Sequence, residues 1–195
     1  KEGGKDGIGT SGVSAMYNQE MPEAVAPERD HYDFGGYYSQ RNGKGTQYYD
    51  ENMASVANWD KKEGTVLYAY WIPHTFSVAF DKNGGTGGSN DVIASYEQPM
   101  PSAIKPTKTG YRFVGYYLGN EPYYDENMNS TNNWNFAENG KTLIAKWSKR
   151  EYPVVLNIVD NLTDNITVTY DEPMPPKNKP TRLGYEFKGY YTQPN

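Results

Sequence analysis

The segment Tyr111-Arg112-Phe113-Val114-Gly115-Tyr116-Tyr117 belongs to a block that occurs three times in this chain of 195 residues. Its other copies read Tyr32-Asp33-Phe34-Gly35-Gly36-Tyr37-Tyr38 and Tyr185-Glu186-Phe187-Lys188-Gly189-Tyr190-Tyr191. Aromatic residues at every second position before the glycine are typical of a strand with one buried face. Self-similarity along a chain is the signature of tandem repeats. The block therefore predicts a string of small β units built on one pattern.

The sequence on both sides of this block repeats as well. Upstream, a tyrosine precedes a Met-Pro step three times, with the tyrosine at Tyr17, Tyr96 and Tyr170. Between residues 17 and 38, 11 of 22 positions are identical to the residues found 79 positions later, which excludes chance. Downstream, the six residues 48–53 recur unchanged as 123–128.

These repeats divide the chain into three predicted domains. Residues 1–72 form a first repeat without its opening strand, residues 75–148 form a complete second repeat, and residues 151–195 form a third repeat that ends before its closing strands. The links between repeats are short and contain proline, which leaves neighbouring repeats little freedom. We therefore expect an elongated array with restricted orientations.

The complete second repeat predicts the fold of one unit. Its strands are expected at residues 77–81, 92–96, 111–118, 122–124 and 142–147. The glycine-rich segment 83–88 predicts a hairpin turn, because glycine adopts positive φ freely. The polar segment 125–134 predicts one short helix with Met128 and Trp134 pointing inward. Five strands and one helix indicate an α+β, β-rich unit of the β-grasp type.

Three motifs together carry a family resemblance. Asp81-Lys82-Asn83-Gly84-Gly85, the segment from Pro106-Thr107 to Tyr116, and Leu143-Ile144-Ala145-Lys146-Trp147 closely follow the pattern of the Listeria–Bacteroides repeat, also called the internalin B B-repeat. The chain resembles that family over almost its whole length. The resemblance implies tandem β-grasp (ubiquitin- or SUMO-like) modules of secreted or wall-anchored bacterial proteins, regarded as spacers or interaction modules, with no catalytic residues.

The repeats depart from the family pattern at three places. His31 stands where the other copies have Gly110 and Gly184. Residues 1–13 replace a clean Asn-Gly-Gly turn in the first repeat, and Asp160-Asn161-Leu162 form a shorter turn in the third. We expect altered local geometry at these places.

Composition narrows the possible functions. The formal net charge of −5 gives no basic surface for nucleic acid or for an anionic membrane. No apolar run is long enough for a membrane-spanning helix, so no membrane insertion is expected. The absence of cysteine excludes disulfides and thiolate metal sites.

Catalytic and metal chemistry find little support. His31 and His74 are the two histidines, and they occupy a turn and a linker. The acidic pairs Asp50-Glu51 and Asp125-Glu126 lack the ligand spacing of a calcium loop and indicate solvated turns or helix caps. We expect no enzyme activity, no cofactor and no metal.

Adjacent tyrosines are the candidates for partner binding. Neighbouring residues on a strand face opposite sides, so one tyrosine of each pair is expected to be exposed. An exposed phenol ring can stack on a sugar or anchor a protein interface. Cross-strand packing on a solvated face is the competing interpretation. The candidates for contact with a glycan or a host protein are Tyr37, Tyr38, Tyr48, Tyr116, Tyr117 and Tyr123.

The functional expectation is a non-enzymatic module of an extracellular or cell-surface bacterial protein. It would act as a semi-rigid spacer in an adhesin-like protein. The alternative is a binding module proper, with avidity from repetition, and an enzyme accessory domain is a third possibility. Because the end repeats are incomplete, we expect a monomer or weak self-association through their open strand edges.

Overall fold

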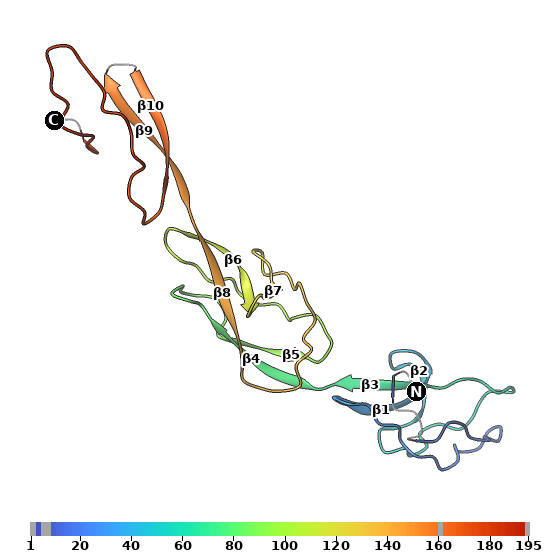
Figure 1. Ribbon diagram of the computed structural model, residues 1–195. Coiled ribbons are helices and arrows are strands. Elements are labelled where there is room, and N and C mark those ends of the chain that lie inside the picture. The colour runs from blue at the N-terminus through green and yellow to red at the C-terminus, as the bar shows by residue number, and fades with distance from the viewer. Residues whose placement is uncertain (1–2, 5–8, 160–161, 194–195) are drawn as a thin grey trace. The chain divides into compact units, whose positions relative to one another are not determined.

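A computed structural model of the chain describes residues 3–4, 9–159 and 162–193. These residues form ten strands and contain no helix (Figure 1). The strands are β1 (Tyr32–Gln40), β2 (Lys44–Tyr49), β3 (Tyr68–Pro73), β4 (Thr75–Asp81), β5 (Asp91–Ser95), β6 (Tyr111–Leu118), β7 (Glu121–Tyr124), β8 (Lys141–Lys149), β9 (Glu151–Val159) and β10 (Leu162–Thr169).

The strands form one sheet for each predicted repeat. The second repeat has five strands in the order β5-β4-β8-β6-β7. The first has three strands in the order β2-β1-β3, and the third has the hairpin β10-β9. All five strands expected in the second repeat are present, and the expected strand 111–118 has the bounds of β6.

A β-bulge in β6 decides which tyrosine faces the core. The register of β6 on β8 shifts between Phe113 and Gly115, where Gly115 has φ = 152° and a side chain would collide with the carbonyl oxygen of Tyr124. The extra residue changes the alternation, so Phe113 and Tyr116 share the buried face, with ring centroids 5.2 Å apart. Tyr117 is left half-buried on the other face.

The prediction of an α+β, β-grasp-like unit is wrong, because the described chain is all-β. The segment expected to be helical turns back on itself. The Asp125 carboxylate accepts the backbone N–H groups of Asn127 and Asn129, both at 2.8 Å, and Met128 adopts φ = 66°. An Asp side chain that bonds the backbone in this way competes with a helix, and a left-handed residue ends one.

Aromatic side chains make up most of the core. In the first repeat, Tyr37, Tyr48, Tyr49 and the two tryptophans Trp59 and Trp71 are buried together with Met21 and Ala69. Buried tyrosine hydroxyls need partners: Tyr49 donates to the Pro22 carbonyl at 2.6 Å, and Tyr48 donates to Asp60. Because each aromatic ring buries a large area, a small repeat reaches a stable core with few residues.

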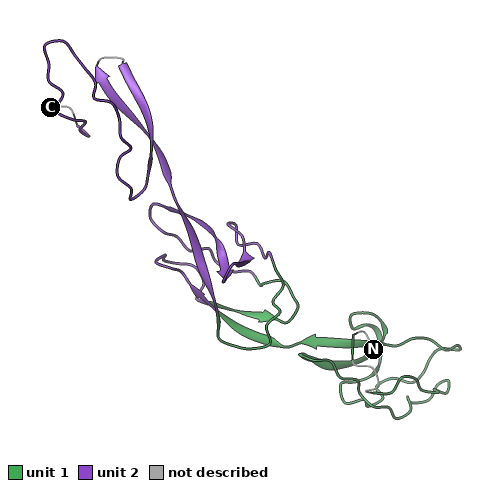
Figure 2. Cartoon of the chain, in the orientation of Figure 1, with its two compact units in different colours: residues 1–78, 91–101, 132–141 green, residues 79–90, 102–131, 142–195 purple. Residues whose placement is uncertain are grey.

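The chain divides into two compact units (Figure 2). One comprises residues 1–78, 91–101 and 132–141, and the other comprises residues 79–90, 102–131 and 142–195. Each unit thus includes part of the second repeat together with one neighbouring repeat. No helix in the described part of the chain is long and apolar enough to cross a membrane.

Two of the expected departures in turn geometry lie wholly or partly outside the described residues. They are the turn at Asp160-Asn161 and the segment 1–13, of which residues 3–4 and 9–13 are described. The third, His31, is described and adopts φ = 64°, the left-handed conformation that Gly110 and Gly184 also adopt.

Candidate functional site

The first link between repeats is a single residue, His74, between β3 and β4. Its N–H donates to the carbonyl oxygen of His31 in the first repeat at 2.9 Å. Its own carbonyl oxygen accepts the N–H of Tyr96 in the second repeat, also at 2.9 Å. Both backbone groups of the linking residue are therefore bonded, one to each repeat.

Side chains enclose this link. The ring of Tyr96 lies 4.7 Å from the ring of His31 and meets Tyr32 edge to face, with centroids 5.9 Å apart. The Tyr32 hydroxyl donates to Glu97 Oε2 at 2.7 Å, and Arg29 Nη2 donates to the same oxygen at 3.1 Å. Arg29 also covers the Tyr32 ring at 3.7 Å. We call residues 29–33, His74, Tyr96 and Glu97 the first joint.

The electrostatics of the first joint favour a neutral Tyr32. Burial raises the pKa of Tyr32 to about 12, and its hydrogen bond to Glu97 acts in the same direction. His74 Nε2 lies 3.0 Å from Asp33 Oδ1 on the exposed side of the joint. These are contacts that position two repeats, and the tyrosine serves as a hydrogen-bond donor.

The second link repeats the backbone arrangement with different side chains. Arg150 alone separates β8 from β9; its N–H donates to the Gly110 carbonyl at 2.9 Å, and its carbonyl accepts the N–H of Tyr170 at 2.8 Å. The rings of Tyr170 and Tyr111 meet edge to face with centroids 5.7 Å apart. Arg150 Nε donates to the Tyr111 carbonyl at 3.1 Å.

An ion pair closes the second joint as well. Lys149 pairs with the Glu172 carboxylate and donates to the Asp171 carbonyl at 3.3 Å. The hydrogen bond to Glu172 raises the pKa of Lys149. We call Gly110, Tyr111, Lys149, Arg150 and residues 170–172 the second joint.

The structure places the six predicted tyrosines in two groups. Four of them are at most 9% exposed and belong to the core, namely Tyr37, Tyr48, Tyr116 and Tyr123. Their phenol rings pack inside their own repeat. Tyr38 and Tyr117 are half-buried at the surface, the first edge to face with Tyr70 and the second under Lys146, whose Nζ lies 4.0 Å from the ring centre.

The polar residues weighed for chemistry serve local structure. Asp50 repeats the turn of Asp125, accepting the N–H groups of Asn52 and Ala54, while Met53 adopts φ = 64°. Hydrogen bonds from Asn129 lower the pKa of Asp125. Within residues 3–4, 9–159 and 162–193, no cluster of three or more His, Asp or Glu residues is arranged to hold a metal ion.

The sequence alone does not show that the joint residues lie together. Tyr96 and Tyr170 were recognised as repeated, but nothing in the sequence connected them with Tyr32 and Tyr111, which lie about sixty residues away in the chain. The available signal was the repetition itself. Glu97 follows Tyr96, and Glu172 lies two residues after Tyr170. Each of these acidic residues belongs to the joint of its tyrosine.

Repeated sheets connected by repeated joints define a tandem-repeat protein of small β units. The chain belongs to the Listeria-Bacteroides repeat domain family, whose pattern matches residues 1–69, 76–146 and 157–195. The resemblance found in the sequence is therefore confirmed.

Relatives place this repeat within longer proteins. The chain is 29% identical over 194 residues, 95% of its length, to a protein of Evansella cellulosilytica named as a Gly-rich membrane protein. It is 29% identical over 154 residues, 76% of its length, to Internalin H of Listeria monocytogenes. The chain spans 20% and 25% of the lengths of these two relatives. No solved structure is a significant match to the chain.

Proposed function

We propose that this chain is a non-enzymatic spacer of a bacterial surface or secreted protein, in which the joints hold successive repeats in one orientation. The observation that carries the proposal is that the two joints share one arrangement of backbone hydrogen bonds and an edge-to-face tyrosine pair. Each uses a one-residue link bonded on both sides, an edge-to-face tyrosine pair and an ion pair. A contact set repeated at successive links is what a spacer of fixed geometry requires.

The energies of these contacts suit a semi-rigid link. An aromatic pair contributes about 0.5–1.5 kcal/mol beyond its buried area, and each backbone hydrogen bond adds about 0.5–1.5 kcal/mol net. The ion pairs are partly exposed and add little. A total on the order of 3 kcal/mol keeps a joint closed in about 99% of molecules. Such a joint bends under load without unfolding the repeats.

Surface location is supported by the relatives. One relative is an internalin, and others carry the name of membrane protein. A spacer in such a protein would carry another domain away from the cell. The acidic net charge of −5 is compatible with an extracellular surface, since it provides no affinity for nucleic acid.

Small-angle X-ray scattering of the 195-residue chain, with and without a mixture of glycans, tests this proposal. A spacer gives a maximum dimension that is stable over concentration and does not respond to sugar. A broad distribution of dimensions in the glycan-free sample would contradict restricted joints. The scattering should be read at low protein concentration, where contacts between molecules are few.

A binding role remains a second proposal for two residues. Tyr38 and Tyr117 occupy equivalent surface positions, and each exposes part of a phenol ring. Repetition of a weak contact would give avidity. A change in scattering or in the NMR signals of these two rings on adding glycan would favour this role. Loss of that response in the Tyr38→Ser, Tyr117→Ser double variant would assign it to these side chains.

A further inference from the structure

The second repeat connects one joint to the next through its first and last strands. β4 follows His74 directly, and β8 is followed directly by Arg150. Both linking residues are held by the backbone hydrogen bonds of their joints. Tension along the chain therefore enters this repeat at the start of β4 and leaves it at the end of β8.

These two strands are neighbours in the sheet, and they run in the same direction. β4 and β8 are adjacent in the order β5-β4-β8-β6-β7. Near the start of β4, the N–H of Ser77 donates at 2.8 Å to the side-chain oxygen of Asn139, two residues before β8. Just after β4, the carbonyl oxygen of Lys82 accepts the indole N–H of Trp147, late in β8, at 3.0 Å. The two starts lie together and the two later parts lie together, so β4 and β8 form a parallel pair.

Parallel neighbours that are loaded at opposite ends are pulled past each other. The hydrogen bonds of a strand pair cross from one strand to the other at even spacing, so tension along the strands strains many of them at once. Two strands loaded at a common end separate instead one hydrogen bond at a time. Because each hydrogen bond contributes little by itself, simultaneous loading gives much more resistance than sequential loading.

Side chains tie the end of β4 to β8. Asn83 Nδ2 donates to the carbonyl oxygen of Ala145 at 3.1 Å, and Lys108 Nζ donates to the carbonyl oxygen of Asn83 at 3.0 Å. The turn that follows β4 is therefore attached to the middle of β8. Sliding of β4 along β8 breaks the Asn83 bond together with the bond from Trp147 to Lys82.

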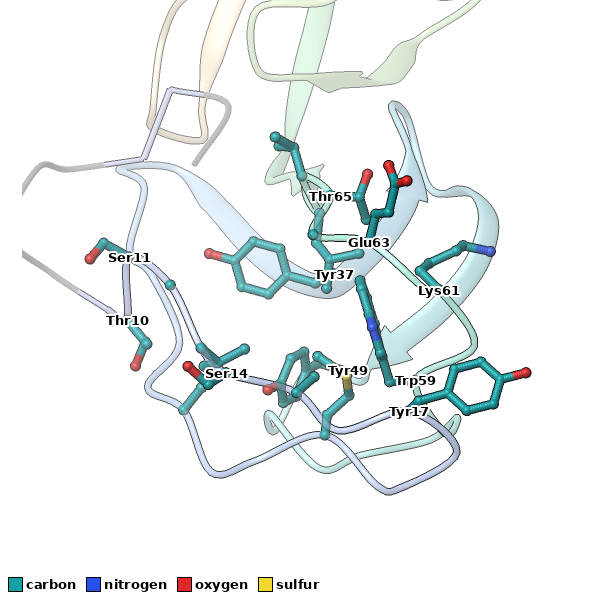
Figure 3. A pocket seen from close by; sticks show the side chains of 18 of the residues that line it. Thr10, Ser11, Ser14, Tyr17, Tyr37, Tyr49, Trp59, Lys61, Glu63 and Thr65 are labelled. Atoms are coloured by element: carbon teal, nitrogen blue, oxygen red, sulfur yellow. The ribbon is translucent and has the colours of Figure 1, made fainter.

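The inner faces of both strands are part of the core, so sliding also disturbs its packing. Val78 of β4 and Leu143 of β8 are fully buried. The ring of Phe80, from β4, packs on Tyr116 and Tyr124, with centroids 4.4 Å and 5.6 Å away. Equivalent aromatic rings cluster in the core of the first repeat, as Figure 3 shows for Tyr37, Tyr49 and Trp59.

We propose that the second repeat is a load-bearing element, in which shear between β4 and β8 resists tension between His74 and Arg150. This role rests on the proposed spacer function, because a spacer that carries a domain away from a surface transmits any force that acts on that domain. The joints have few contacts and open first under tension. The sheet of the repeat then holds the chain against further extension.

Pulling single molecules of the 195-residue chain by its two ends in optical tweezers measures this resistance. Rupture of the second repeat is recognised by its length, since residues 75–149 extend to roughly 250 Å. The chain has no cysteine, so a double variant, Thr75→Cys with Glu138→Cys, provides attachment points for a second direction of force. Both residues are exposed and lie beside the starts of β4 and β8, where force separates the strands bond by bond.

The force needed to rupture the second repeat is expected to be higher for pulling by the chain ends than for pulling between positions 75 and 138. Equal forces in the two directions would overturn the load-bearing role. The scattering of the unloaded chain tests the spacer function separately, so that result would leave the spacer function standing.

Two single variants assign the resistance to the β4–β8 pair. Asn83→Asp keeps the shape of the side chain and tolerates positive φ, but it replaces the donor that faces the Ala145 carbonyl with an acceptor. At constant force, its second repeat is expected to rupture about fivefold faster, the factor that the loss of one hydrogen bond supplies. The matched control is Thr131→Val, which removes the bond from Thr131 Oγ1 to the Pro122 carbonyl in β7 and should rupture at the rate of the parent. Equal rupture rates in the two variants would overturn the proposal.

Discussion

The ring of Tyr170 packs directly on the Cα of Gly110 in the second joint. Gly110 has φ = 76°, and a β-carbon built on it would overlap the tyrosine ring. In the first joint the same position holds His31, also in the left-handed conformation, with its ring 4.7 Å from Tyr96. The two joints therefore share a backbone arrangement but hold their tyrosines differently. Tyr170 needs a glycine at this position, whereas Tyr96 packs against the His31 ring.

Gly110→Ala is expected to open the second joint. The substitution costs about 1–2 kcal/mol for a side chain at positive φ, and the overlap with Tyr170 displaces the ring in addition. Hydrogen exchange at the N–H groups of Arg150 and Tyr170 should become about tenfold faster or more, as a loss of about 1.4 kcal/mol implies. Gly119→Ala is the matched control, because Gly119 has φ = 61° and open space around it. Equal exchange at the joint in both variants would contradict the proposed packing.

Tyr96→Ala is expected to loosen the first joint without unfolding either repeat. It removes the ring contacts with His31 and Tyr32 but leaves the backbone amide that bonds His74. Exchange at the N–H groups of residues 74 and 96 should accelerate, while exchange within β6 stays unchanged. The same substitution at the equivalent Tyr17, which is 61% exposed, serves as the control and should leave exchange at residues 74 and 96 unchanged.

The sequence allowed the strands to be predicted better than their surroundings. Alternation of aromatic residues located β6 with the bounds that are found. The expected helix at 125–134 failed because the Asp125 side chain bonds the backbone locally, and composition does not reveal that competition. For tyrosines, the rule of one face in and one face out held where β1 and β6 continue past the pair. The rule failed for the pair Tyr48-Tyr49, in which both side chains are buried. This pair ends β2, and the chain turns back over it.

The contacts of the joints could not be predicted from the sequence, for a different reason. Short links predicted restricted orientations, but the partner of Tyr96 is set by the way one sheet follows another. Tyr32 and Glu97 are 65 positions apart, and their hydrogen bond exists only after both repeats have folded. Contacts of this kind leave no periodic pattern within a single repeat.

Alkaline conditions are expected to weaken the first joint. The pKa of Tyr32 is about 12, above its ordinary value of 10.0, so the neutral phenol is favoured when the joint is closed. The stabilisation from this group is complete below pH 10 and is lost as the pH rises from about 10 to 12. Exchange measurements at high pH are dominated by base catalysis, so the signals of the Tyr96 ring should be followed by NMR instead. Glu97→Gln removes the acceptor charge and should lower the pKa of Tyr32, whereas an unchanged titration would contradict the hydrogen bond.

Tyr116→Phe is expected to stabilise the second repeat. The Tyr116 hydroxyl is buried and has no hydrogen-bond partner among the described residues, and burial raises its pKa to about 12. A buried polar group without a partner costs about 1–3 kcal/mol, and phenylalanine keeps the ring contacts with Phe80 and Phe113. Thermal unfolding should therefore move to higher temperature.

The equivalent change Tyr37→Phe is the matched control for Tyr116→Phe. Tyr37 is 9% exposed, and its hydroxyl is not among the buried ones without a partner. Its replacement should change the unfolding temperature little. A lower unfolding temperature for Tyr116→Phe would mean that an ordered water bonds the hydroxyl in solution, because removal of a satisfied buried group costs stability while removal of an unsatisfied one restores it.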